Sequence, residues 1–268
     1  RAVQRRPFLP DPVKRMLFEK RDGLFLGRFG PLLDSGWLVH GISTRKGGVS
    51  GAPYDSLNLG LNTDDGEDRV RENRRRFFES VGLDETGLVT PRQVHGDTVR
   101  AVDAPGTVPD ADAVVTDRRG IILSIQVADC LPVYLIDPVK KAVGLVHAGW
   151  RGTGKNIAGK TVMVMNKAFG TNASDLLAFF GPSIGPCCCA VEEDASARFD
   201  PSYVRDGRLD LWRCNEDQLL EAGVKSGNVV QSRLCTACHP EWFFSHRASG
   251  GKTGRMLAVL AWNKSLDI

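Results

Sequence analysis

The sequence predicts an α+β fold, in which runs of strands and blocks of helix follow one another without strict alternation. Two observations lead to this class. Short runs rich in Val, Ile and Leu follow one another between residues 113 and 147, separated by turn signals such as Asp117-Arg-Arg-Gly120. Apolar residues at helical spacing occur in two longer segments, one before these runs and one after them.

The individual elements follow from the same patterns. Strands are expected, in chain order, at residues 37–43, 113–116, 121–127, 133–136, 142–147, 176–180 and 255–262. The four between residues 113 and 147 are expected to form one meander. A helix over residues 65–81 has an apolar stripe that ends in Phe77, Phe78 and Val81, and a second helix covers residues 153–169.

Composition limits the class of protein. The chain has 268 residues, of which 42% are hydrophobic and 25% charged, which excludes a disordered, collagen-like or coiled-coil protein. No apolar run approaches the roughly 18 residues of a membrane span. The net charge of +3 is too small to indicate nucleic-acid binding. Residues 1–28 hold eight Lys and Arg against three acids, so we expect residues 1–30 to form an arm outside the core and residues 31–268 one catalytic domain.

Cysteine usage indicates the compartment. Seven cysteines, an odd number in a chain of this length, favour free thiols in a reducing environment over a disulfide framework. The opening residues lack the apolar segment of a signal peptide, so we expect a cytoplasmic location.

Three polar segments stand where predicted strands begin or end. They are Gln93-Val-His95-Gly-Asp97, Ala128-Asp-Cys130 and His147-Ala-Gly-Trp-Arg151-Gly-Thr153. Two imidazoles and a thiolate suit Zn²⁺, and three protein ligands leave a fourth position open for water or substrate. The spacing alone also allows a buried free cysteine and two hydrogen-bonded histidines.

These segments, with others, resemble the YfiH family (DUF152), which covers polyphenol oxidoreductases called laccases and purine nucleoside phosphorylases. The matching segments are HGISTRKGGVS from His40, SLNLG from Ser56, QVHG from Gln93, DADA from Asp110, ADCLP from Ala128, HAGWRG from His147, GPSIG from Gly181, CT from Cys235 and FFSHR from Phe243. His246 departs from the family's tyrosine.

The resemblance implies a zinc site on His95, Cys130 and His147. It implies phosphorolysis of adenosine, guanosine, inosine and 5′-methylthioadenosine, together with deamination of adenosine. It also implies a multilayer sandwich of mixed β-sheets flanked by helices, related to a cysteine-hydrolase-like toxin fold. Some bacterial relatives are linked to peptidoglycan editing.

Proton transfer and phosphate binding need further groups. Cys130, His147 and Asp129 are the expected catalytic residues, and Asp97 is a second carboxylate that could shuttle a proton or orient a histidine. The expected contacts to phosphate or nucleoside are Arg45, Asn58, Arg151 and Arg247. Arg151 would act beside a helix N-terminus capped by Thr153.

Two cysteine patterns are set apart from this site. Cys235-Thr-Ala-Cys238-His239 matches covalent haem attachment, but no export signal accompanies it. Its two cysteines could bind metal or form a redox pair, although a second CxxC is lacking. In a strand, Cys187-Cys-Cys189 would alternate its side chains and could not direct all three at one metal.

Rival functions stay open. Copper in place of zinc would give a laccase-like polyphenol oxidoreductase, although five histidines are too few for a trinuclear copper cluster. A metal-free hydrolase would use Cys130 as nucleophile and His147 as base. A binding protein with a structural metal is the non-enzyme alternative. The expected partners are small molecules rather than nucleic acid or membrane, and a monomer is plausible.

Overall fold

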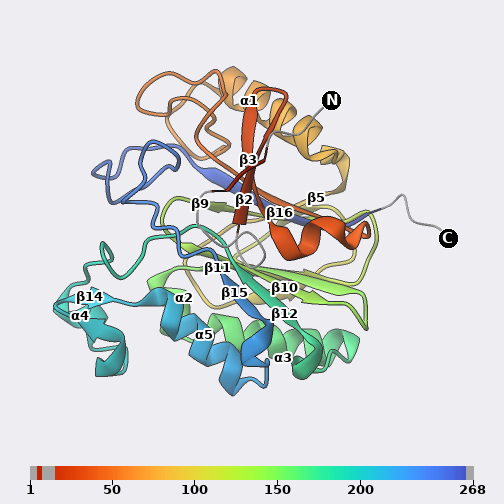
Figure 1. Cartoon of the computed structure of the whole chain (residues 1–268), viewed down its shortest axis with the longest axis vertical. Helices are drawn as coiled ribbons and strands as arrows, with labels where there is room; N and C mark the ends of the chain where they lie inside the picture. Colours follow the sequence, from red (N-terminus) through yellow and green to blue (C-terminus); the bar gives the residue numbers. More distant parts are fainter. Residues whose placement is uncertain (1–4, 8–15, 264–268) are drawn as a thin grey trace.

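The computed structural model describes residues 5–7 and 16–263, which form two mixed β-sheets stacked between helices (Figure 1). Figure 1 shows α1 (Glu67–Val81) above one sheet, with α3 (Ile157–Phe169) and α5 (Leu211–Glu221) below the other. The predicted α+β class is confirmed, and so is the sandwich of mixed sheets.

The first sheet has eight strands in the order β1-β2-β3-β4-β16-β9-β5-β7. Their bounds are β1 Arg5–Pro7, β2 Met16–Arg21, β3 Leu24–Phe29, β4 Leu38–Ser43, β5 Leu88–Pro91, β7 Gly106–Val108, β9 Ile122–Val127 and β16 Met256–Trp262.

The second sheet has six strands in the order β15-β12-β10-β11-β8-β6. Their bounds are β6 Val99–Ala101, β8 Ala113–Thr116, β10 Leu131–Asp137, β11 Ala142–Ala148, β12 Leu177–Phe180 and β15 Val229–Gln231. The described chain also has two short α-helices, α2 Trp150–Thr153 and α4 Glu193–Ser196, a two-stranded sheet of β13 Val204–Arg205 and β14 Arg208–Leu209, and five 3-10 helices: η1 Gly30–Ser35, η2 Glu85–Gly87, η3 Ala173–Asp175, η4 Pro201–Tyr203 and η5 Ser226–Asn228.

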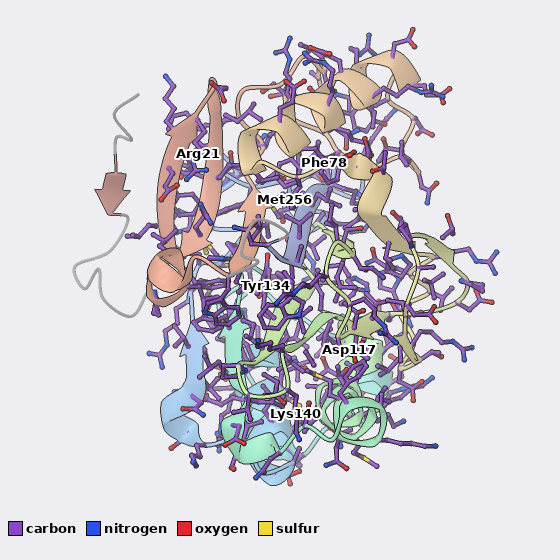
Figure 2. The ribbon with its side chains drawn as sticks, turned by 90° about the vertical axis from the view of Figure 1, so that its right-hand side faces the viewer. Arg21, Phe78, Asp117, Tyr134, Lys140 and Met256 are labelled. Atoms are coloured by element: carbon purple, nitrogen blue, oxygen red, sulfur yellow. The ribbon has the colours of Figure 1, made fainter. Side chains whose placement is uncertain are left out.

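Side-chain alternation along the strands builds the layers. In β16, Met256 and Ala258 face the second sheet, whereas Leu257 and Val259 pack towards α1. Tyr134 of β10 lies between the sheets, as Figure 2 shows, and its hydroxyl donates to the Gly41 carbonyl at 2.9 Å. Tyr134 of β10 therefore links the second sheet to β4 of the first, by both apolar packing and a buried hydrogen bond.

Residues 16–29 correct the expectation that residues 1–30 form an arm outside the core. β2 and β3 pair as an antiparallel hairpin within the first sheet, and Met16, Phe18 and Phe29 are buried between the sheets. The arm was predicted from the high local charge, which does not reveal the buried apolar residues of this strand pair. The side chains of the other predicted arm residues, among them Arg1, Arg5, Arg6, Lys14 and Arg15, lie outside the described part of the chain.

The run between residues 113 and 147 is not the single meander that was predicted. β8, β10 and β11 pair in the second sheet, whereas β9 pairs with β16 and β5 in the first. All four strands are largely buried, so their hydrophobicity does not reveal which sheet each one joins.

The helix predicted over residues 153–169 is interrupted. α2 ends at Thr153, and α3 begins at Ile157 after Asn156, which has a left-handed φ of 61°. The Asn156 side chain caps α3 by accepting the Gly159 N–H at 3.2 Å. Thr153 is therefore not the predicted N-cap.

Candidate functional site

The ends of neighbouring strands bring the predicted metal ligands together. Cys130 directly precedes β10, and His147 lies near the end of β11, where it is opposite Pro132 of β10. His95 lies on the loop after β5. One nitrogen from each histidine and the Cys130 Sγ all lie within 4.8 Å of one another.

A buried carboxylate, Asp112, shapes this group. Its oxygens accept the backbone N–H groups of Val94, His95 and Gly96 at 3.2, 2.9 and 2.7 Å. The same carboxylate accepts Nδ1–H of His147 at 2.8 Å. Asp112 therefore fixes the loop that carries one histidine and the ring of the other.

Asp112 was not among the residues predicted for the site. The sequence offered a signal, because Asp112 immediately precedes a predicted strand within the DADA segment. Nothing in the sequence alone shows that it would be fully buried against a loop 16 to 18 residues earlier.

The donor set fits a metal ion. With Nδ1 of His147 committed to Asp112, Nε2 is the nitrogen left for an ion. A carboxylate behind a ligating histidine is the usual outer support of a zinc ligand. Two imidazole nitrogens and one thiolate match the donors that Zn²⁺ and copper take, with room for a fourth ligand.

The charges of the three groups support one another. Burial disfavours the Cys130 thiolate, but the charge of His147 and hydrogen bonds from both histidines outweigh this and lower the pKa of Cys130 to about 6. Burial also disfavours a charged His147, yet the Cys130 charge and the Asp112 hydrogen bond raise its pKa to about 9. The protein without metal thus favours a thiolate, the form that binds metal.

Two glycines of the HAGWRG segment allow close approach. A Cβ on Gly149 would lie 3.1 Å from the Cys130 Sγ and 3.4 Å from a ring carbon of His95. A Cβ on Gly152 would lie only 2.5 Å from the carbonyl oxygen of Gly96. Larger side chains here would push the two histidine-bearing segments apart.

Asp129 lies beside the ligands, but both of its oxygens are engaged. Thr236 Oγ1 donates to one at 2.6 Å, and the Arg247 backbone N–H donates to the other at 2.7 Å. Asp129 has a φ of 92° and is 8% exposed. Its contacts attach two later loops to the segment that carries Cys130.

The three ligands line a cavity of about 610 Å³, a size suited to a small molecule. Four arginines line it: Arg92, Arg151, Arg247 and Arg255. Ile184, Leu211 and Trp150 provide apolar wall, and His246 also lines the cavity.

The arginines are partly held in place. The Arg247 guanidinium donates to the carbonyls of Cys188 and Ala190 at 3.2 and 2.8 Å, and the Arg151 guanidinium lies 4.2 Å from the Trp150 ring centre. Two of the five N–H groups of Arg247 are used in this way, which leaves donors for an anion.

Two residues predicted to bind substrate lie elsewhere. The Arg45 guanidinium donates to the carbonyls of Asp55 and Pro240 at 2.8 and 2.7 Å and pairs with the Asp55 carboxylate. Asn58 is fully buried, and its side chain holds the loop through Thr63 and other neighbours. Neither lines the cavity of the triad, and both side chains form hydrogen bonds with backbone groups of nearby loops.

Asp97 also falls outside the cavity. Its carboxylate forms ion pairs with Lys160 and, at 3.5 Å, with Lys155. The Lys160 hydrogen bond is the main cause that lowers the pKa of Asp97. Asp97 therefore anchors the His95 loop to α3 rather than facing a substrate.

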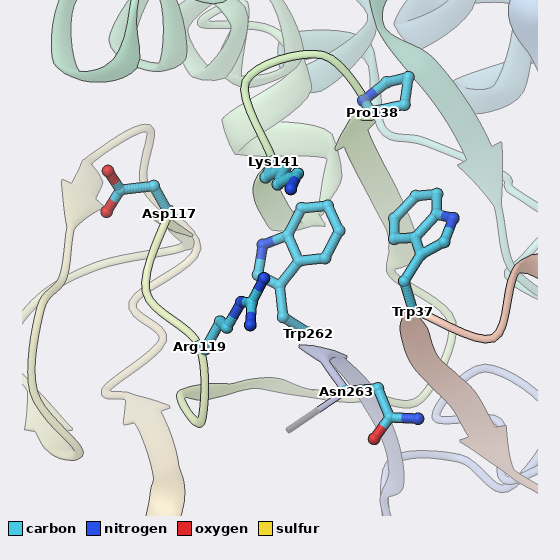
Figure 3. A pocket seen from close by; sticks show the side chains of 7 residues that line it. All are labelled: Trp37, Asp117, Arg119, Pro138, Lys141, Trp262 and Asn263. Atoms are coloured by element: carbon cyan, nitrogen blue, oxygen red, sulfur yellow. The ribbon is translucent and has the colours of Figure 1, made fainter. Parts of the chain in front are cut away.

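A second cavity, of about 310 Å³, is lined by Trp37, Trp262 and five other residues (Figure 3). The two indoles stack with ring centres 4.7 Å apart, and Figure 3 shows Arg119 and Lys141 beside Trp262. None of the residues predicted for the site lines this cavity. Among the described residues, no helix has the length and apolar character needed to cross a membrane.

The chain is similar to known proteins over most of its length. The family model described as multi-copper polyphenol oxidoreductase laccase matches residues 39–263. Purine nucleoside phosphorylase YlmD of Geobacillus stearothermophilus is 37% identical over 244 residues, which cover 83% of this chain and 89% of that protein. A purine nucleoside phosphorylase of Deinococcus radiodurans is 38% identical over 229 residues, or 82% of this chain and 88% of that protein. The crystal structure of YlmD from G. stearothermophilus has a TM-score of 0.85 at 35% identity, over 92% of this chain and 99% of that one.

Proposed function

Because the chain belongs to the YfiH family (DUF152) of multi-copper polyphenol oxidoreductase laccases, in which several relatives are named purine nucleoside phosphorylases, we propose that it is a zinc-dependent purine nucleoside phosphorylase. Its substrates are adenosine, inosine, guanosine and 5′-methylthioadenosine, and it also deaminates adenosine. The observation that carries the proposal is the His95–Cys130–His147 group at a cavity lined by four arginines.

The three ligands would hold Zn²⁺ with one position open. When bound there, the ion supplies Lewis acidity and lowers the pKa of water towards roughly 7. Asp112 keeps Nε2 of His147 directed at the ion by accepting its Nδ1–H, and it holds the His95 loop through three backbone N–H groups. These contacts fix two of the three ligands before substrate arrives.

Phosphorolysis joins phosphate to C1′ of the ribose and releases the purine base. It therefore requires a site for a dianion next to the sugar. Arg247 and Arg255 line the cavity with N–H groups beyond those already used by backbone carbonyls, and Arg151 lies on its rim. We assign phosphate binding to these arginines in place of Arg45, which pairs with Asp55 and does not line the cavity.

The purine would lie against the apolar wall of Ile184 and Leu211. Deamination replaces the amino group at C6 with oxygen and releases ammonia, so it needs an activated water near the same ring. Asp129 is fully hydrogen-bonded and buried, which suits a role in positioning Cys130 and Arg247 rather than in proton transfer.

A product assay tests the proposal. The purified protein, with its zinc content measured, is incubated with adenosine in the presence and absence of phosphate, and the products are separated by chromatography. We expect adenine and ribose 1-phosphate only with phosphate, and inosine in both conditions. His147→Ala should abolish both. If wild-type protein that carries zinc yields neither product, the proposal is wrong.

A metal-free hydrolase is the second candidate, and one observation favours it. Cys130, His147 and Asp112 form a thiolate–imidazole–carboxylate series, with the Cys130 pKa near 6 and the Asp112–His147 contact at 2.8 Å. Iodoacetamide distinguishes the two. A zinc-bound Cys130 should resist alkylation until a chelator removes the ion, whereas a free nucleophile should react at once.

A further inference from the structure

Four cysteines outside the catalytic cavity meet in one place. Cys187 and Cys188 follow β12, and Cys235 and Cys238 follow β15. β12 and β15 are parallel neighbours, so the segments that follow them leave the sheet at the same edge. The four Sγ atoms lie within 4.8 Å of one another, with Cys238 at 3.5 Å from Cys187 and 3.4 Å from Cys188.

A turn makes this convergence possible. The N–H groups of Cys188 and Cys189 both donate to the Gly185 carbonyl, at 2.9 and 3.0 Å. Residues 187–189 therefore do not form a strand, and the adjacent Cys187 and Cys188 both place their thiols against Cys238. Cys189 lies outside the group and lines the catalytic cavity instead.

We propose that Cys187, Cys188, Cys235 and Cys238 form a second, structural zinc site with four thiolate ligands. Zn–S bonds of about 2.3 Å in a tetrahedron place the sulfur atoms about 3.8 Å apart, close to the separations found here. Four protein ligands close the coordination sphere, which is typical of zinc that holds loops together rather than zinc that catalyses.

A backbone donor at the site favours negative charge on Cys235. Its Sγ accepts the N–H of Gly185 at 3.2 Å. Gly185 is required for this approach, because a Cβ there would lie 2.7 Å from the Trp212 ring and 3.3 Å from the Cys235 Cβ. Such N–H groups favour thiolate over thiol.

The site braces one wall of the catalytic cavity. Thr236, between two of the cysteines, donates to Asp129 beside Cys130, and the Arg247 guanidinium donates to the carbonyl of Cys188. Joining the two loops through an ion would hold Asp129 and Arg247 in their present places. The site thus acts through positioning and does not touch the substrate.

Metal content provides the test. Full-length protein produced with zinc is analysed by elemental mass spectrometry beside three variants: Cys235→Ser/Cys238→Ser, Cys130→Ser/His147→Ala, and Cys214→Ser. Cys214 is the matched control, a buried cysteine outside both groups. We expect two zinc ions per chain in wild type and Cys214→Ser, and one in each double variant. Retention of one ion by Cys130→Ser/His147→Ala supports the second site whether or not the nucleoside assay succeeds.

Two further measurements test the four-cysteine zinc site if Cys235→Ser/Cys238→Ser does not fold. Cobalt added to metal-stripped Cys130→Ser/His147→Ala should give the intense sulfur-to-metal absorption of a tetrahedral thiolate site. In wild type, the exposed Cys187 and Cys238 should resist alkylation until a strong chelator is added. No cobalt absorption, immediate alkylation of both thiols, or an intact mass about 2 Da low that reductant restores, as a disulfide would give, overturns the proposal.

Discussion

The two candidate metal-binding groups of the molecule lie on opposite sides of Asp129 in the hydrogen-bond network, and they are built differently. The His95–Cys130–His147 group stands on strand ends and is oriented by a buried carboxylate. The four-cysteine group stands on turns, and backbone N–H groups orient it. The first has mixed donors and an open position, whereas the second has four equal donors.

The difference in the number of ligands indicates different roles, a reaction at the first group and the stabilisation of loops at the second. Three ligands and an adjoining cavity expose an ion to substrate, and four ligands enclose it. Asp129 connects the two, because it receives hydrogen bonds from Thr236 and Arg247 while it precedes Cys130 in the chain.

The thiols of the two groups should titrate about five pH units apart in metal-stripped protein. The charge of His147, despite burial, brings the pKa of Cys130 to about 6, whereas burial and the hydrogen bond with Cys238 raise that of Cys188 to about 11. Thiolate forms as pH rises through the pKa, and only thiolate reacts with iodoacetamide. Peptide mapping of alkylation against pH should show Cys130 half-maximal near pH 6 and Cys188 still largely unreacted at pH 9.

His147→Gln provides the control for this titration. It removes the charge that stabilises the thiolate, so the Cys130 midpoint should move up towards the ordinary value of 9.0, while the Cys188 profile stays in place. Equal midpoints for Cys130 and Cys188 in wild type would show that the two groups do not differ electrostatically.

Removal of one catalytic ligand should eliminate the reaction but spare the other group. We expect Cys130→Ala to lose one zinc ion and at least about 10³-fold in phosphorolysis, since a catalytic metal contributes several kcal/mol. Zinc content and initial rates measure both effects. Cys214→Ala is the matched control and should keep the wild-type rate and metal. A rate within tenfold of wild type for Cys130→Ala would contradict the assigned role.

Asp112→Asn should weaken zinc binding by about 10- to 100-fold, the usual effect of losing the partner of a metal ligand. The amide has one acceptor oxygen where the carboxylate uses two, so it cannot receive all of the present N–H groups. Competition with a coloured chelator measures the affinity. Asp117→Asn, an exposed carboxylate after β8, is the control. Unchanged affinity in Asp112→Asn would mean that the histidines hold their places without it.

The sequence was informative where the pattern is local. Most predicted strands, and the helix over residues 65–81, lie within a few residues of their observed bounds, because alternation and helical spacing reflect burial directly. The sheet that each strand joins could not be predicted. β9 and β10 are both buried on two faces, and their partners come from distant parts of the chain.

The candidate site was likewise predicted only in part. His95, Cys130 and His147 were predicted as neighbours from the family resemblance of their segments, and the structure places their donor atoms within 4.8 Å of one another. Arg45 and Asn58 were polar residues in matching segments, and only the folded loop reveals that they bind neighbouring loop groups and do not line the cavity. The four-cysteine group was missed because its formation depends on a turn and on the parallel pairing of β12 with β15.

The smallest predicted effect concerns the binding of phosphate in the catalytic cavity. Arg151→Met should raise the KM for phosphate about fivefold, roughly 1 kcal/mol, and leave kcat nearly unchanged, because an exposed arginine contributes a screened charge to binding. Arg198→Met is the matched control, since Arg198 also lies over the Trp150 ring, at 5.8 Å, but does not line the cavity. Equal KM changes in both variants would show that Arg151 acts only by packing on Trp150, and phosphate binding would then rest on Arg247 and Arg255.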